Sequence, residues 1–405
     1  METTRVILCI GTLDSKGPEL KYVKNLINSK RDYQALVMDV GCLEEAYFDA
    51  DVTAGEVARA AGTTIEEVRA IAEAGPATRI MTEGARKVVR ELYASDRFSG
   101  VLAIGGGTGS GIAAAVLQDL PIGFPKFMLS SQKIVQAGIR KYVGTKDIVI
   151  LPSIADIAGL NRLTIDSLQK AVGAITGIMD TISPENFDNP LVFMTMTGLS
   201  TGCGLAVKSR LEREGFEVGV FHTIGVGGET FEELVRSYPV KGVIELGLNE
   251  IGNELFGGLA SAGPGRLEAA GEAGIPQIIT PGCIDILNFL GPETLPEKYA
   301  GRAICYHNPQ ATLPRVSADE QRQIAMTMSE KLNRSKGRVK FLVPLRGFSS
   351  IDCEGNDFYD PGANTAFIET LQDSLRDDIE IVKIDANINA PEFSETVVNE
   401  FLRIL

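Results

Sequence analysis

The chain has 405 residues, 44% hydrophobic and 23% charged, a composition typical of globular proteins. Its 39 basic and 53 acidic residues give a formal net charge of −14, which disfavours binding to nucleic acid or to anionic membranes. No apolar run reaches the ~20 residues that a membrane span needs, and METTRVILCI shows no signal-peptide pattern. The length predicts two or three domains.

The six cysteines point to the compartment in which the protein works. They stand at positions 9, 42, 203, 283, 305 and 353, and none forms a C-x-x-C pair. This spacing excludes a zinc knuckle and a thioredoxin-type motif. Cys9 and Cys305 lie in apolar, strand-like runs, so we expect reduced thiols and a cytoplasmic protein.

The first half of the chain alternates apolar strands with helices. A strand over 5–11 precedes a helix that starts at Pro18, because proline suits the first helical position. Further strands are expected at 35–41, 101–104, 124–131 and 146–153, with helices within 53–97, over 112–117 and over 161–183. Such an alternation predicts a parallel sheet that is covered on both faces.

The polar segment 183–190, which contains two prolines, interrupts this pattern. We therefore predict an N-terminal α/β nucleotide-binding domain over 1–185 and a C-terminal α/β domain over 190–405. The second half is expected to have strands at 191–198, 216–225, 240–246, 275–282, 338–345 and 379–384, and helices over 199–215, 228–237, 317–337, 361–377 and 391–405.

The glycine-rich run GGGTGSG over 105–111 joins a buried strand to an Ala-rich helix. A strand, a glycine loop and a helix N-terminus present backbone N–H groups to an anion. Hydroxyl groups of Thr108 and Ser110 add donors. The alternative is a tight turn without a ligand, but such a turn needs glycine at only one or two positions. The predicted phosphate-binding residues are Gly105, Gly106, Gly107, Thr108, Gly109 and Ser110.

A second candidate loop, GTLDSKG over 11–17, follows the first strand. Lys16 can neutralise a phosphate and Asp14 can hold Mg²⁺, although Asp14 can equally accept N–H groups at the helix start. Asp39, which ends the second strand, suits either a ribose hydroxyl or a turn. The chain has neither a Walker A motif nor a G-x-G-x-x-G after its first strand, which disfavours an NAD-dependent redox enzyme.

The second half holds the only two histidines, His222 and His307. Each can transfer a proton or contact a substrate carboxylate, or can be a polar residue at the rim of the sheet. Arg266 lies at a predicted helix start after small residues, which makes it a weaker candidate anion site. Asp285 falls in an apolar stretch and therefore needs a partner, for which Arg315 or Arg266 is available.

Taken together, the motifs resemble one family over essentially the whole chain. In order, these motifs are GTLDSKG, GGGTGSG, DIAGLNR, MTMTGLSTG, VFHTIGVGG, SAGPGRLEAAGEAGIPQIITPGCIDILNF, HNP and FYDPGAN. They are similar to an uncharacterised bacterial and plant family that includes the N-terminal domain of the tomato mosaic virus resistance protein. The resemblance implies two Rossmann-like subdomains, each a mostly parallel sheet flanked by helices, ATP binding with Mg²⁺, and a barrel partner resembling phosphoenolpyruvate hydrolase. It marks Gly11, Thr12, Asp14, Lys16, residues 105–111, His222 and His307.

Two functions follow as hypotheses. In the first, Mg-ATP binds at the glycine loop and activates a small carboxylate metabolite in an interdomain cleft that faces His222, His307 and Arg266. In the second, the chain is a non-catalytic module in which the nucleotide controls the binding of a protein partner. For either hypothesis we expect a homo-oligomer.

Overall fold

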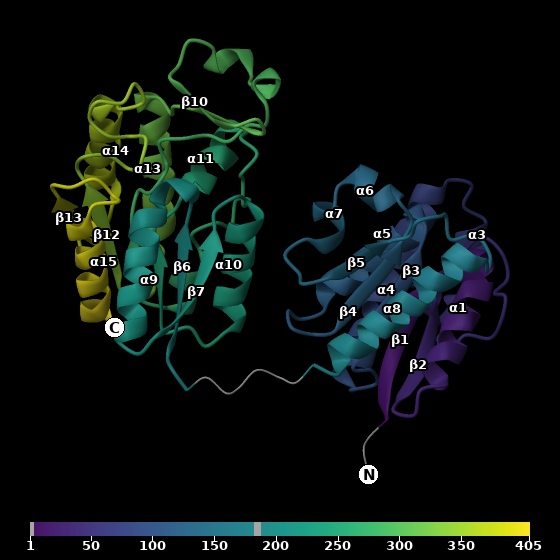
Figure 1. The fold of residues 1–405 in the computed structure, drawn as a ribbon. Helices are drawn as coiled ribbons and strands as arrows, with labels where there is room; N and C mark the ends of the chain where they lie inside the picture. The colour runs from purple at the N-terminus through teal and green to yellow at the C-terminus, as the bar shows by residue number, and fades with distance from the viewer. Residues whose placement is uncertain (1–3, 182–187) are drawn as a thin grey trace. The chain divides into compact units, whose positions relative to one another are not determined.

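The computed structural model describes residues 4–181 and 188–405 of the chain. The chain divides into two compact units, Met1–Pro184 (unit 1) and Glu185–Leu405 (unit 2) (Figure 1). Part of the predicted boundary segment, residues 183–187, lies outside the described residues.

Unit 1 is a five-stranded parallel sheet with helices on both faces. Its strands are β1 (Arg5–Gly11), β2 (Tyr33–Asp39), β3 (Gly100–Gly105), β4 (Lys126–Ser130) and β5 (Val149–Pro152). Its helices are α1 (Leu13–Asn28), α2 (Ala54–Ala60), α3 (Ile65–Arg69), α4 (Ala74–Ala94), α5 (Gly107–Asp119), α6 (Lys133–Ala137), α7 (Arg140–Val143) and α8 (Arg162–Met179). The strand order is β2-β1-β3-β4-β5.

Alternation along the strands divides the core of unit 1 into two layers. Leu8 and Ile10 of β1 pack with residues of α2, α4 and α5 on one face. Their neighbours Ile7 and Cys9 pack with residues of α1 and α8 on the other face. Both faces are therefore apolar, as a parallel sheet between two helical layers requires.

Unit 2 has a six-stranded parallel sheet and a separate two-stranded antiparallel hairpin. Its strands are β6 (Leu191–Met196), β7 (Glu217–His222), β8 (Gly242–Glu245), β9 (Gln277–Ile279), β10 (Ile304–Asn308), β11 (Ala311–Pro314), β12 (Val339–Pro344) and β13 (Glu380–Ile384). Its α-helices are α9 (Thr201–Arg213), α10 (Val226–Ser237), α11 (Asn249–Phe256), α12 (Ala269–Ala273), α13 (Ala318–Leu332), α14 (Pro361–Ser374) and α15 (Pro391–Ile404). Short 3₁₀ turns lie at η1 (Gly198–Ser200), η2 (Pro292–Thr294) and η3 (Glu297–Tyr299).

The order of the larger sheet in unit 2 is β13-β12-β9-β8-β6-β7. Helices α9 and α15 cover one face, and α10, α13 and α14 contribute to the other (Figure 1). The predicted α/β class, with two mostly parallel sheets flanked by helices, is therefore confirmed.

Two local predictions differ from the structure. The first helix starts at Leu13 and contains Pro18 in its interior, and its backbone leaves helical geometry at Lys16 (φ −128°, ψ 21°). The β10–β11 hairpin was not predicted, although Cys305 of β10 was placed in an apolar, strand-like run. Its strands are short and β10 is exposed from Tyr306 onward, so the apolar run is too brief to indicate the pairing.

Candidate nucleotide site

The candidate site lies where the connections of the first sheet change direction. From the centre of that sheet, β1 continues to β2 on one side, while β3 pairs with β1 on the other side. Loops at the carboxyl ends of two such strands diverge and leave a crevice, the usual ligand position in open α/β sheets. The loops after β1 and β3 are the two that carry the predicted motifs.

Both loops line one cavity of about 340 Å³, within the usual size range of small-molecule sites. At its polar end the cavity is lined by Thr12, Asp14, Ser15, Lys16, Gly106, Gly107, Thr108 and Gly109. Its apolar lining includes Val40, Val68, Ile71, Ala72, Ala74, Ala77 and Ile112. The cavity thus combines a polar end with an apolar wall.

The glycine loop leaves backbone donors facing this cavity. Helix α5 begins at Gly107, and no side chain caps it. The first-turn N–H groups of a helix have no partner within the helix, so those of Gly107, Thr108 and Gly109 remain available. A side-chain carbon at Gly105 would lie 2.5 Å from the backbone nitrogen of Ser110, whereas one at Gly106 would meet nothing within 4 Å. Gly105 is therefore required for packing, while Gly106 leaves the cavity open.

The loop after β1 brings a cation and a carboxylate to the same cavity. Lys16 forms no ion pair with a described residue, and its ammonium makes only a 3.4 Å contact with the Ser15 carbonyl. Asp14 Oδ2 accepts the Leu43 N–H at 2.8 Å, while Asp14 Oδ1 is buried and has no hydrogen-bond partner among the described residues. Thr12 Oγ1 lies 2.8 Å from Ser15 Oγ.

Gly11 and Asp39 do not line this cavity, but they pack against or hydrogen-bond to the loops that do. A side-chain carbon at Gly11 would lie 2.9 Å from a carbonyl oxygen of β3, so only glycine allows these strands and α1 to pack. Asp39 is 3% exposed, and its Oδ1 accepts N–H groups of Leu13 at 2.9 Å and Gly41 at 2.8 Å. Asp39 therefore connects the loops after β1 and β2. It does not reach this cavity, where it was predicted to bind a ribose hydroxyl.

Ser110 also has a structural position, contrary to its predicted role as a phosphate donor. The residue is 1% exposed, and its hydroxyl group donates to the Gly105 carbonyl at 3.0 Å and lies 2.7 Å from Ser130 Oγ. One helical turn after Gly107, the side chain points back to the ends of β3 and β4. Thr108, by contrast, is exposed and lines the cavity.

Sequence reasoning missed the contribution of α3 and α6. Arg69, the last residue of α3, lines the cavity and donates to Glu45 and to the Glu44 carbonyl. Lys133 at the start of α6 lies over the glycine loop: a side-chain carbon at Gly107 would be 3.3 Å from its Cδ and 3.8 Å from its Nζ. Neither residue belongs to a local motif, because only tertiary packing brings it to the loop.

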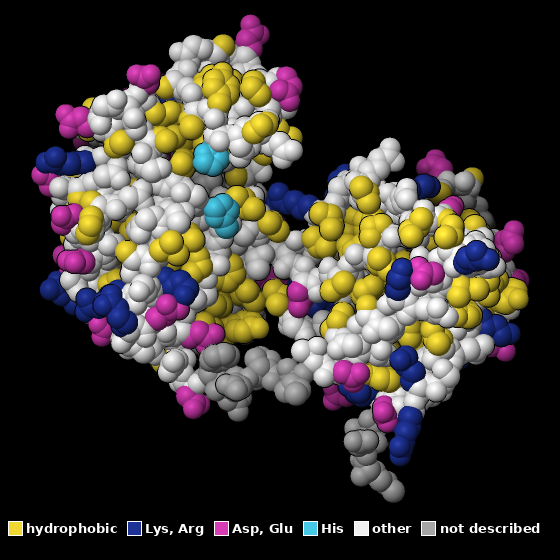
Figure 2. Space-filling model, viewed as in Figure 1, with side chains coloured by type: hydrophobic (Ala, Val, Ile, Leu, Met, Phe, Trp, Pro, Cys, Tyr) yellow, Lys and Arg dark blue, Asp and Glu magenta, His cyan; other side chains and the backbone are white. Residues whose placement is uncertain are grey.

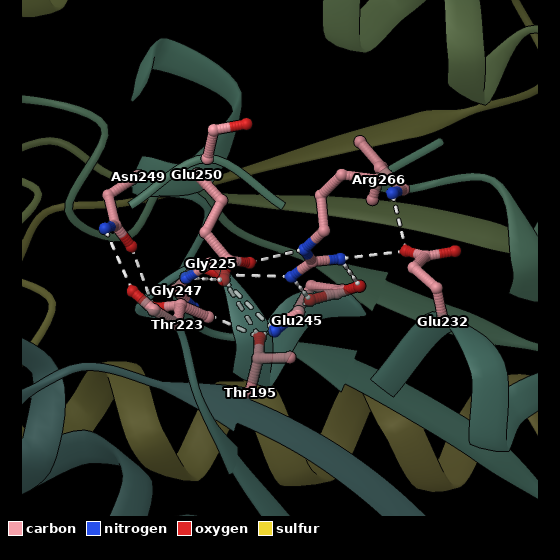
Figure 3. A network of polar contacts seen from close by, with 12 residues as sticks. Thr195, Thr223, Gly225, Glu232, Glu245, Gly247, Asn249, Glu250 and Arg266 are labelled. Carbon is pink, nitrogen blue, oxygen red and sulfur yellow. Dashed lines mark hydrogen bonds and ion pairs between the residues drawn. The ribbon is translucent and has the colours of Figure 1, made fainter. Parts of the chain in front are cut away.

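In unit 2, Arg266 is the centre of a buried ion network (Figure 3). Its guanidinium group is fully buried and donates from Nε to Glu250 at 2.6 Å, from Nη1 and Nη2 to Glu245 at 2.6 Å each, and from Nη1 to Glu232 at 3.1 Å. The prediction of an anion site at Arg266 is therefore wrong, because three carboxylates already occupy its donors.

The same carboxylates hold backbone segments together. Glu250 accepts the N–H groups of Gly225 at 2.7 Å and Gly228 at 3.1 Å, and Glu232 accepts those of Leu267 and Ala269. Burial raises the pKa of Glu250, an effect that the charge of Arg266 opposes. Burial alone would lower the pKa of Arg266, but Glu245, Glu250 and Glu232 raise it well above its ordinary value.

The two histidines are both visible on one face of unit 2 (Figure 2). His222 ends β7 and His307 lies in β10 of the hairpin, and both are exposed. Partial burial lowers the pKa of His222. Neither imidazole makes a hydrogen bond or an ion pair with a described side chain, so the structure gives neither of them an orienting partner.

Asp285 is completely buried in unit 2, and the residue beside it is Arg315, not Arg266. Arg315 Nη1 donates to the backbone carbonyl of Asp285 at 3.3 Å, and Ser349 donates to Asp285 Oδ2 at 2.8 Å. Asp285 Oδ1 has no partner among the described residues. Burial, reinforced by the charge of Asp352, raises the pKa of Asp285 to about 6.

A metal-binding cluster and a membrane-spanning helix are both absent from residues 4–181 and 188–405. In these ranges, no three or more His, Cys, Asp or Glu side chains converge as a metal site would require. None of the helices there combines the length and the apolar character needed to cross a bilayer.

Comparison with known proteins agrees with the resemblance seen in the motifs. Models for the N-terminal and C-terminal domains of the uncharacterised protein family UPF0261 match residues 5–184 and 189–405. The chain is 37% identical to a UPF0261 protein of Clostridium tetani over 98% of both chains, and 34% identical to one of Rhizobium meliloti over 97% of both. It is also 30% identical to the ToMV resistance protein Tm-1(GCR237) of Solanum lycopersicum, over 98% of this chain but 55% of the tomato protein.

Proposed function

We propose that unit 1 binds Mg-ATP in the cavity between the loops after β1 and β3. The chain belongs to the uncharacterised family UPF0261. The proposal therefore rests on the residues of the site. The observation that carries this proposal is that the uncapped start of α5 lines the same cavity as Lys16, whose ammonium forms no ion pair with a described residue. Three or four charge-assisted hydrogen bonds of roughly 1.5–3 kcal/mol each reach the ~8 kcal/mol of micromolar affinity.

The proposed assignment matches the phosphates and the base of the nucleotide to different parts of the cavity. The phosphates would accept from the N–H groups of Gly107, Thr108 and Gly109 and pair with Lys16. The apolar wall, which includes Val68 and Ile112, suits the flat face of a base. The phosphate end and the apolar end thus support a nucleotide over a free phosphate.

The residues present fit a magnesium ion through Asp14. Its buried Oδ1 has no hydrogen-bond partner among the described residues, so a cation would satisfy it. Mg²⁺ is commonly held by one or two carboxylates together with substrate phosphates and water, so a single Asp suffices. When bound, the ion would neutralise phosphate charge, while Asp14 fixes its position.

Two forms of this function remain as proposals. ATP-dependent activation of a small carboxylate, with a barrel-type partner protein, needs a cationic contact other than Arg266 for that carboxylate. A nucleotide-gated binding module needs no such contact. The lining of the cavity favours it, because this lining holds no histidine that could act as a base. Its one thiol, Cys42, has a pKa raised by burial and is therefore a poor nucleophile.

Calorimetric titration of the purified chain with ATP, GTP and NAD, each with Mg²⁺, tests the proposal. Gly106→Val places a side chain in the cavity, and Gly111→Val is the matched control, because a side-chain carbon at either position meets nothing within 4 Å. We expect micromolar ATP binding that weakens at least tenfold in Gly106→Val and is unchanged in Gly111→Val.

Two results would overturn the proposal: no ATP binding by the wild type, or equal binding by both variants. An assay of ADP release on the same samples then separates the two forms. Turnover that depends on an added carboxylate supports the enzyme. Binding without turnover, together with ATP-dependent compaction in X-ray scattering, supports the gated module.

A further inference from the structure

Unit 1 has a second cavity next to the first, at the carboxyl end of β2. Its volume is about 280 Å³, and it lies between the loop after β2 and the first turns of α2 and α3. The charged residues that line it are Asp39, Glu45, Asp49, Glu66 and Arg69. Arg69 lines both cavities, so its side chain separates them.

The charge of this second cavity is strongly negative. Its single guanidinium group, on Arg69, is already engaged by Glu45 and by the Glu44 carbonyl. Among the described residues, Asp39, Asp49 and Glu66 form no ion pair. The cavity therefore presents three carboxylates that have no ion-pair partner among the described residues.

Asp39 is the feature that points to a ligand. The side chain is 97% buried and its two hydrogen bonds, to Leu13 and Gly41, both use Oδ1. Oδ2 accepts no hydrogen bond from a described residue, although the side chain lines the cavity. Burial raises the pKa of Asp39, and a cation beside Oδ2 would remove this penalty.

A metal ion held by protein side chains alone does not explain the arrangement. In the described ranges no three His, Cys, Asp or Glu groups converge closely enough to hold one. The carboxylates are instead distributed around a space of many atoms, together with the apolar side chains of Phe48 and Ile65. This combination suits an elongated molecule with a charged end and a methylene stem.

We propose that the second cavity binds a small organic amine in its ammonium form, with Asp39 Oδ2 accepting from the ammonium group and Phe48 contacting the stem. An ammonium group has three donors and no acceptor, which matches a lining rich in carboxylates. The site goes beyond the proposed nucleotide function and does not depend on it. An amine in the second cavity would be separated from the nucleotide cavity only by the side chain of Arg69. That position suits a second substrate or an effector.

The test uses three molecules of equal length that differ in charge: butane-1,4-diamine, butane-1,4-diol and succinate. Each is titrated into the full chain by calorimetry without nucleotide, so the outcome is independent of ATP binding. We expect the diamine to bind with at least millimolar affinity and the other two to bind at least tenfold more weakly. Equal binding of the diol, or no binding of the diamine, would overturn the proposal.

Asp39→Asn assigns the binding to this cavity. Asparagine keeps an oxygen that can accept from Leu13 and Gly41 but loses the charge, and we expect the affinity for the diamine to fall at least tenfold. The exposed Asp49→Asn is a second variant that does not touch these loop contacts, with an expected loss of at least threefold. Asp166→Asn, on the surface of α8, is the matched control. Diamine binding that is unchanged in both cavity variants would refute the site.

Discussion

Replacing Arg266 with methionine should destabilise unit 2 more than any other single change of charge considered for this protein. The substitution keeps a long side chain but leaves Glu232, Glu245 and Glu250 buried without their cation. Removing one partner from a buried ion pair costs about 3–5 kcal/mol, because an uncompensated charge remains. Here one guanidinium serves three carboxylates, so the upper part of that range applies.

This free energy translates into a measurable shift. For a domain of the size of unit 2, each kcal/mol changes the melting temperature by about 2–4 °C, so a loss of about 4–5 kcal/mol should lower it by about 8–20 °C. Differential scanning calorimetry should show this decrease in the transition of unit 2, with the transition of unit 1 unchanged.

The control is Arg322→Met, which removes an exposed pair with Asp319 and should cost less than about 1 kcal/mol. Arg266→Lys keeps the charge but cannot reach all three carboxylates, so its melting temperature should fall between those of the wild type and the methionine variant. A methionine variant that melts within 2 °C of the wild type would refute the view that this network holds unit 2 together.

Three further predictions follow from single residues. The raised pKa of Asp285 means that the folded state binds this proton more tightly than the unfolded state. This group's contribution to stability is therefore greatest below about pH 4 and is lost as the pH rises through about 6. Calorimetry should show this dependence in the wild type and lose it in Asp285→Asn. Gly84→Ala places a carbon 2.0 Å from the Val57 carbonyl oxygen and should cost about 1–3 kcal/mol in urea unfolding, whereas Gly75→Ala, which meets nothing, should not destabilise. Lys16→Met should raise the Kd for Mg-ATP about tenfold and reduce its salt dependence, and an unchanged Kd would remove Lys16 from the site.

The sequence was sufficient for the two parallel sheets because their inner strands, such as β1, β3 and β8, are almost entirely buried. Runs such as that of β1 are apolar throughout, and the predicted and observed bounds agree within a few residues. It was also sufficient for the two loops of the candidate site, because strand ends and glycines are local signals. Ser110 and Asp39 show what the sequence could not predict. Both are polar residues of the glycine loop or of a strand end, but the direction in which each side chain points depends on residues that are distant in the sequence.

Arg266 shows a second limit. A cationic residue after small residues at a helix start is typical of an anion site, and nothing nearby in the sequence indicates otherwise. Its partners, Glu232, Glu245 and Glu250, come from α10, β8 and α11, which only the fold brings together. The apolar wall of the nucleotide cavity was missed for the same reason, since α3 and α4 reach it through packing alone.

The strand order of the two sheets has a consequence for synthesis on the ribosome. In each unit the strand made first, β1 or β6, is an inner strand with a partner on each side. Residues 40–99 separate β2 from β3, so at 5–20 residues per second one edge of β1 waits roughly 3–12 s for its second partner. Only residues 223–241 separate β7 from β8, so the second edge of β6 stays unpaired for only roughly 1–4 s. Of the two strands made first, β1 is thus the one whose second edge stays unpaired for longer during synthesis.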